Sequence, residues 1–129
     1  MLLGRFPPIL SGAGLQALTL SKALRAVGVG VFVVTARRDN SPRMEKIQGL
    51  PVHRIGTIRR SRLSVYRWSL AVLPTLFRKR REYDVLHIHG VNIWGMPAAL
   101  LARWCGKRVV IKVTGYAQDD PLHLQKEKF

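Results

Sequence analysis

Short segments rich in valine and isoleucine alternate along this chain with longer segments of helical periodicity, and that alternation is the strongest constraint on its fold. The short segments have 5–7 residues, and several are apolar at successive positions. Such runs are typical of strands buried on both faces of a parallel sheet. The alternation predicts an α/β domain with a doubly wound, mostly parallel sheet and helices on both faces. The predicted strands are Val29–Thr35, Val52–Ile58, Val85–His89 and Val109–Thr114.

Two helical segments have well-marked ends. Apolar residues at helical spacing predict a first helix over residues 13–27, and Gly28 follows it as a residue suited to a helix C-terminus. A second helix is predicted over Ala98–Cys105. Pro97 is expected in its first turn, and Gly106 ends it.

The segment Arg59–Arg81 combines a wide apolar face with arginines at both ends. Its apolar part, Leu63–Phe77, is too short and too interrupted by charge to span a bilayer, and Pro74 is expected to kink or divide the helix. Two interpretations stay open. One is a crossover helix that covers the sheet, and the other is an interfacial helix on an anionic membrane. In the second, the membrane-contacting residues are Arg78, Lys79, Arg80 and Arg81.

The length of 129 residues corresponds to one domain, and the 47% of hydrophobic residues is enough to bury a core. The single cysteine, Cys105, excludes an intramolecular disulfide and indicates a reducing compartment. Only Met1–Gly4 is available as a first strand, and Leu122–Phe129 starts a new helical pattern at the other end. We therefore expect a single domain over residues 1–129 that is truncated at both ends.

The charge balance is strongly basic, with 22 lysines and arginines against 7 aspartates and glutamates and a formal net charge of +15. Such a charge calls for an anionic partner: nucleic acid, an anionic membrane face or a phosphorylated small molecule. No zinc-finger spacing, RNP aromatic pattern or helix-turn-helix supports nucleic acid. A non-enzymatic basic α/β module that binds nucleic acid is kept as the alternative hypothesis.

The segment Phe6–Gly14 lies between the first expected strand and the first helix. Gly12 and Gly14 permit backbone conformations that side chains forbid, and the helix N-terminus beyond them offers free amide groups. A tight turn and a phosphate site both fit this pattern. A P-loop is excluded because no Gly-Lys-Ser/Thr follows, and the alanine at position 17 disfavours the dinucleotide motif of dehydrogenases.

Polar residues also follow two of the later strands. His87 and His89 share one face of their strand, but no third ligand has suitable spacing, so no metal is expected. His89 and Gly90 lie at the C-terminal end of the strand, where open α/β sheets bind ligands. After the last strand come Asp119 and Asp120, which either cap the next helix or contact a ligand.

Taken in order, the motifs resemble the N-terminal, acceptor-side domain of glycosyltransferase family 4. The resemblance extends from about Arg5 to Pro121 and rests on the ordered set rather than on one motif. It implies a Rossmann-like domain that forms the N-terminal half of a GT-B fold. The segments that carry it are Phe6–Gly14, the helix ending at Gly28, Val31–Thr35, Gly49–Ile55, Asp84–Gly90 and Lys107–Gly115.

The resemblance implies a retaining enzyme that moves a sugar from a UDP- or GDP-linked nucleotide-sugar to an acceptor, with no cofactor and no catalytic metal. The donor diphosphate loop then corresponds to Gly12, Ala13 and Gly14. The acceptor side corresponds to His89, Gly90, Thr114, Gly115 and Asp119. Two positions depart from the family pattern: Thr114 stands where many members have histidine, and Gly14 where many have glutamate.

The nucleotide-binding half of such enzymes carries two glutamates separated by seven residues, and the chain has no such pair. We therefore expect that the C-terminal donor-binding domain is missing and that the chain alone is inactive. The intact enzyme would act on a lipid-linked or polysaccharide acceptor. Its expected location is the cytoplasm, peripheral to the inner face of the plasma membrane.

Overall fold

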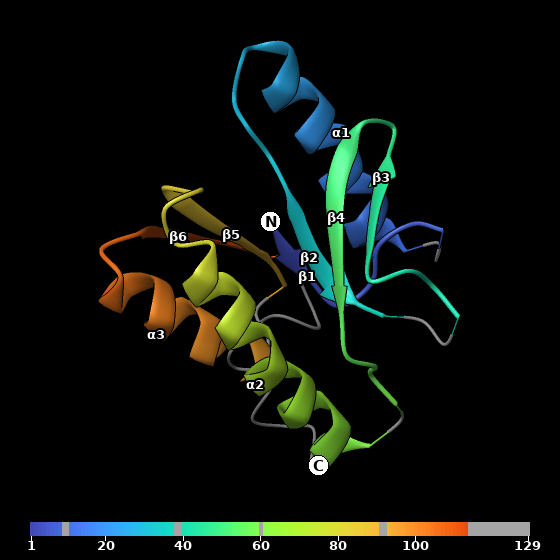
Figure 1. Ribbon diagram of the computed structural model, residues 1–129, viewed down its shortest axis with the longest axis vertical. Coiled ribbons are helices and arrows are strands. Elements are labelled where there is room, and N and C mark those ends of the chain that lie inside the picture. The colour runs from blue at the N-terminus through green and yellow to red at the C-terminus, as the bar shows by residue number, and fades with distance from the viewer. Residues whose placement is uncertain (9–10, 38–39, 60, 91–92, 114–129) are drawn as a thin grey trace.

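The computed structural model describes residues 1–8, 11–37, 40–59, 61–90 and 93–113. These residues form a six-stranded sheet with helices on both faces (Figure 1). In chain order the elements are β1 (Leu2–Leu3), α1 (Gly12–Ala26), β2 (Val33–Ala36), β3 (Met44–Ile47), β4 (Leu50–Ile55), α2 (Arg62–Arg78), β5 (Val85–His89), the 3-10 turn η1 (Ile93–Gly95), α3 (Met96–Trp104) and β6 (Arg108–Lys112).

The sheet has the strand order β3-β4-β2-β1-β5-β6, and every pairing except that of β3 with β4 is parallel. The chain builds outward from β1 through β2 to β4, then returns past β1 to form β5 and β6. This reversal beside the first strand defines a doubly wound, Rossmann-like sheet. The predicted fold class is therefore confirmed.

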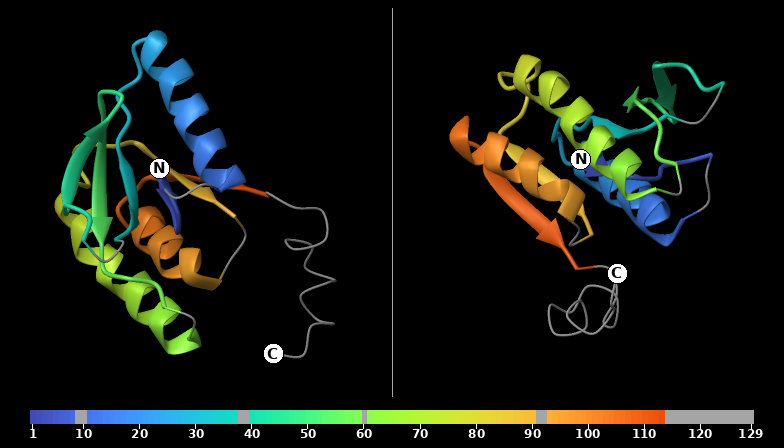
Figure 2. Two further views of the ribbon diagram at one scale, coloured as in Figure 1. Left: turned by 90° about the vertical axis from the view of Figure 1, so that its right-hand side faces the viewer. Right: turned by 90° about the horizontal axis from the view of Figure 1, so that it is seen from below.

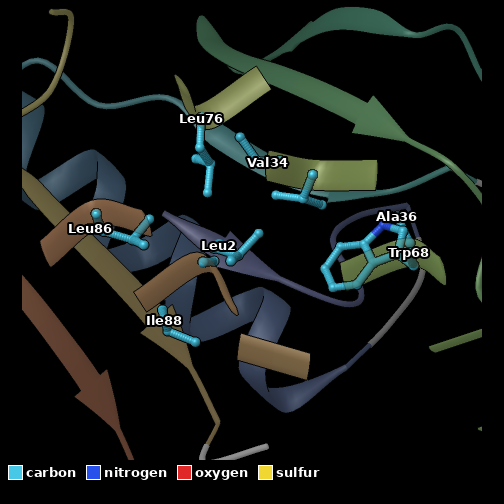
Figure 3. Packing of buried hydrophobic residues seen from close by; sticks show 10 residues of the cluster. Leu2, Val34, Ala36, Trp68, Leu76, Leu86 and Ile88 are labelled. Atoms are coloured by element: carbon cyan, nitrogen blue, oxygen red, sulfur yellow. The ribbon is translucent and has the colours of Figure 1, made fainter. Parts of the chain in front are cut away.

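The two faces of the sheet are covered by different helices (Figure 2). Leu2 packs with Trp68 and Leu86 in a cluster beneath α2 and α3, which Figure 3 shows from close by. Leu3 packs with Ala17 of α1 in the cluster on the opposite face. Because successive side chains of a strand point to opposite faces, two residues are enough for β1 to join both cores.

Strand β2 begins four residues later than the sequence predicts. The first residues of the predicted strand instead form hydrogen bonds that end α1. The amide of Gly28 donates to the carbonyl of Arg25 at 3.0 Å, and the amide of Val29 donates to that of Leu24 at 3.0 Å. Gly28 has a φ of +85°. These bonds form a Schellman motif, so the glycine ends the helix as predicted and delays the strand.

Strand β3 is not predicted from the sequence, and β4 is shifted toward the N-terminus to Leu50–Ile55. The two strands form an antiparallel hairpin across Gln48 and Gly49, whose φ angles are 52° and 78°. Positive φ at both central residues is the signature of a tight two-residue hairpin turn. β3 lacks a buried valine or isoleucine run because it lies at the edge of the sheet.

Helix α2 is continuous from Arg62 to Arg78, so the expectation that Pro74 divides it is wrong. Pro74 is exposed, and so is Leu70, whose carbonyl would accept the helical hydrogen bond that proline cannot donate. Trp68 anchors the opposite side, where its indole Nε1 donates to the carbonyl oxygen of Ile55 at 2.7 Å.

Candidate functional site

The candidate site lies at the carboxyl edge of the sheet, where β1 and β5 are neighbours. Leu2 of β1 pairs with Ile88 of β5, and the chain leaves both strands at this edge. From β1 it continues to the N-terminus of α1, and from β5 it continues to Gly90. Adjacent parallel strands whose connections diverge leave a crevice between their ends, which is where doubly wound sheets bind ligands.

Gly12, Ala13 and Gly14 form the first turn of α1 rather than a loop before it. Ser11 is the N-cap, and its Oγ accepts a hydrogen bond from the amide of Gly14 at 3.0 Å. Within the described residues, the amides of Gly12 and Ala13 have no hydrogen-bond acceptor. Two free N–H groups at the positive end of a 15-residue helix can bind an anion.

The two glycines of this turn differ in how much space a side chain would have at each position. A Cβ at Gly14 would lie 2.8 Å from Ser11 Oγ and 3.1 Å from the carbonyl oxygen of Arg5. A Cβ at Gly12 would have no atom within 4 Å. Neither residue adopts a positive φ. Gly14 is therefore required for close packing of the loop on the helix, and a glutamate at this position needs the loop to move.

Arg54 holds the connection from β1 to α1, and sequence reasoning did not single it out. It is buried, its Nη2 donates to the carbonyl oxygen of Pro7, and its Nε pairs with Oε1 of Glu45. Phe6 fixes the same connection by full burial in the cluster under α1. The alternation of β4 was the available signal, because Arg54 shares a face with the core residue Val52.

His87 and His89 lie on the face of β5 that points toward α1, since Leu86 and Ile88 pack on the other face. Their rings stack with centroids 4.4 Å apart and an interplanar angle of 25°. Burial, together with the neighbouring His87 and Lys112, lowers the pKa of His89 to about 4. The pKa of His87 is also lowered, chiefly by burial. Both rings are therefore neutral near pH 7.

His89 is 3% exposed, and neither of its ring nitrogens has a partner among the described residues. Next to it, Lys112 of β6 donates from Nζ to Oε1 of Gln16 at 2.7 Å, which links β6 to α1. Gly90 follows His89 with a φ of +102°, a conformation that favours glycine. The edge thus combines free backbone donors, a lysine and a neutral histidine whose nitrogens are unsatisfied.

The other predicted site residues are not gathered at this edge. Arg78, Lys79, Arg80 and Arg81 end α2 at the opposite, amino edge, because α2 runs antiparallel to the strands it connects. Nζ of Lys79 pairs with Oε2 of Glu82 at 2.6 Å. The guanidinium of Arg80 lies 4.2 Å from the ring centroid of Phe77. Thr114, Gly115 and Asp119 lie outside the described residues.

A cavity of about 720 Å³ beside α2 places Arg78 and Lys79 next to further basic side chains that sequence reasoning did not single out. It extends along β4 on the side of α2, and its described lining contains no acidic residue. Among the described residues there is no group of three or more histidine, cysteine, aspartate or glutamate side chains suited to a metal ion. The basic lining residues are Arg37, Arg43, Arg54, Arg78 and Lys79, with His53 between them.

The fold and this edge define a Rossmann-like α/β domain with a helix N-terminus at its topological switch point. The sequence profile of the family described as glycosyl transferase 4-like domain matches residues 11–128. The chain belongs to this family, which confirms the resemblance seen in the sequence and assigns the domain to glycosyltransferases in general. No curated protein and no solved structure matches the chain.

Proposed function

We propose that the chain is the acceptor-side domain of a retaining glycosyltransferase, which transfers a sugar from a UDP- or GDP-linked nucleotide-sugar to a lipid-linked or polysaccharide acceptor. The observation that carries the proposal is the match to the glycosyl transferase 4-like family over residues 11–128. The position of α1 at the switch point is consistent with it. No cofactor and no metal take part.

The donor diphosphate is proposed to contact Gly12, Ala13 and Gly14. The free amides of Gly12 and Ala13 are donors for phosphate oxygens, and the helix dipole favours negative charge there. Gly14 supports the contact indirectly, because its amide holds the N-cap Ser11 in place. The capped turn is thus organised before a ligand arrives.

The acceptor side is proposed at His89 and Gly90 and to include Thr114, Gly115 and Asp119. His89 supports this role through its two unpartnered ring nitrogens. A neutral imidazole offers one donor and one acceptor, which suits the hydroxyl groups of a sugar. A buried position without hydrogen bonds costs free energy that a bound hydroxyl group can recover.

A second Rossmann-like domain is proposed as the partner that supplies the nucleotide site, so the chain alone turns over no substrate. The proposed location is cytoplasmic, at the inner face of the plasma membrane, with contact through Arg78, Lys79, Arg80 and Arg81. Within the described part of the chain, no helix is long and apolar enough to cross a bilayer.

The test is a sugar-transfer assay on a polypeptide in which a donor-binding domain follows this chain. In Gly12→Asp a carboxylate occupies the open space at the first turn. The carboxylate stabilises the helix N-terminus but repels a diphosphate, so the KM for the nucleotide-sugar should rise about tenfold or more. Asparagine has the shape of aspartate without its charge, so the KM of Gly12→Asn should stay near that of the wild type. Equal KM values for all three proteins would overturn the assignment of the donor loop, and an absence of transfer with UDP- and GDP-sugars would overturn the proposed reaction.

A further inference from the structure

Helix α2 has an apolar stripe that the core does not use. Its sheet-facing side buries Trp68, Val72 and Leu76. Leu63, Tyr66 and Leu70 follow one another at helical spacing on the other side and are exposed, with Leu70 60% accessible. The stripe therefore points away from the sheet.

Helix α3 continues this apolar surface. It buries Ala98 and Ala102 against the core, while Met96, Leu100 and Trp104 are exposed at spacings of four residues. The two helices lie side by side on one face of the sheet (Figure 2). The rings of Phe77 and Trp104 stack across them, with centroids 6.4 Å apart. We call the two exposed stripes together the α2–α3 outer face.

Charge limits what can cover this face. Neither helix contains an acidic residue, and Arg67, Arg78 and Arg103 are exposed on them. Arg81, just beyond α2, is exposed as well. Arg78 also lines the basic cavity of about 720 Å³, so positive charge continues from the flank of the face into the cavity. A partner must therefore be apolar at its centre and anionic at its rim.

We propose that the α2–α3 outer face docks on an anionic phospholipid bilayer. Leu70, Leu100 and Trp104 enter the boundary between headgroups and acyl chains, and the flanking arginines bind lipid phosphates. A nucleic acid would meet the arginines but leave the leucines in water. A second copy of this basic chain would bring like charges together. The inference rests on the proposed membrane location and not on the sugar-transfer reaction.

Docking through this face gives the carboxyl edge a definite orientation. The outer face lies parallel to the sheet, whereas Gly12 and His89 lie at an edge of the sheet. That edge then opens sideways along the membrane surface. A lipid-linked acceptor could then extend its headgroup to this edge while its lipid chain stays in the bilayer.

The test is sedimentation of the 129-residue chain with vesicles of phosphatidylcholine containing about a third phosphatidylglycerol. Leu70→Ser with Leu100→Ser should weaken binding about tenfold or more, because two apolar side chains no longer leave water. The matched control, Val27→Ser with Met44→Ser, changes two residues that are equally exposed but lie on other elements. Its affinity should equal that of the wild type.

Two sets of charge-removing substitutions test whether the flanking arginines are needed for vesicle binding. Replacing Arg78, Arg81 and Arg103 by glutamine should weaken vesicle binding by about tenfold to a hundredfold. The control replaces Lys22 and Arg25 of α1 and Lys46 of β3 by glutamine, which removes the same charge away from this face and should have a much smaller effect. Vesicles of pure phosphatidylcholine should bind weakly.

The depth of insertion is read from tryptophan emission. Trp104 is 78% exposed and Trp68 is buried, so a blue shift on vesicle binding that is lost in Trp104→Phe reports this face. Unchanged vesicle binding by the leucine variant would overturn the proposal. So would self-association, or RNA binding in place of vesicle binding. No nucleotide-sugar is present in these assays, so their failure leaves the Gly12→Asp transfer test unaffected.

Discussion

At the scale of single residues, space and burial decide what the first turn of α1 can tolerate. Gly14 faces the backbone of Arg5 and the side chain of Ser11, whereas Gly12 faces open space. In the sequence the two glycines look equivalent, because they flank Ala13 in a Gly-Ala-Gly run. Their contacts predict opposite responses to the same substitution.

Gly14→Ala should lower the free energy of unfolding by about 1–3 kcal/mol, because the added methyl group displaces the β1–α1 connection. Gly12→Ala should leave it unchanged or raise it by less than about 1 kcal/mol. Urea denaturation followed by circular dichroism measures both. Equal losses in the two variants would contradict the crowding seen at Gly14.

At the scale of elements, α2 carries a proline in its interior while α3 carries one in its first turn. Pro74 removes a helical hydrogen bond, whereas Pro97 stands where the amide has no partner in a helix. The same residue type thus has a cost in one helix and none in the other.

Pro74→Ala should raise the free energy of unfolding by roughly 1–3 kcal/mol, because the new amide can donate to the carbonyl of Leu70. Pro97→Ala is the control and should change stability little. Thermal denaturation of both variants is the measurement. A loss of stability in Pro74→Ala would mean that α2 depends on the proline ring.

At the scale of the whole molecule, the buried histidines couple stability to pH. Burial lowers the pKa of His89 from its ordinary value of 6.5 to about 4 in the folded chain, and the pKa values of His53 and His87 are also lowered. The unfolded state therefore binds protons first as the pH falls. Stability is full above about pH 6.5 and decreases below it.

The free energy of unfolding should fall by about 1.4 kcal/mol per pH unit for each such proton, with the contribution of His89 levelling off below about pH 4. His89→Gln should reduce the slope of the unfolding free energy against pH by the contribution of about one proton. Urea denaturation at a series of pH values between 7.5 and 4.5 gives both slopes. A pH-independent stability would show that His89 is not held neutral.

Much of the fold follows from local sequence pattern. The strand Val85–His89 has the predicted bounds, and α1 and α3 lie within a residue or two of the predicted helices, with Gly28 and Gly106 just after them. Periodicity and end signals are properties of consecutive residues, so they can be recognised before the chain folds. The resemblance to glycosyltransferase family 4 has the same origin, because it rests on the order of such segments, and the family match over residues 11–128 confirms it.

The rest depends on residues far apart in the chain. β3 has no hydrophobic run and becomes a strand only by pairing with β4, and Arg54 contacts Pro7 from 47 positions away. The sequence of α2 predicts only a wide apolar face over Leu63–Phe77. Packing against β4 and β5 buries the side of this face that carries Trp68 and leaves the side that carries Leu70 exposed. Only the tertiary structure decides between them, because burial depends on which elements meet.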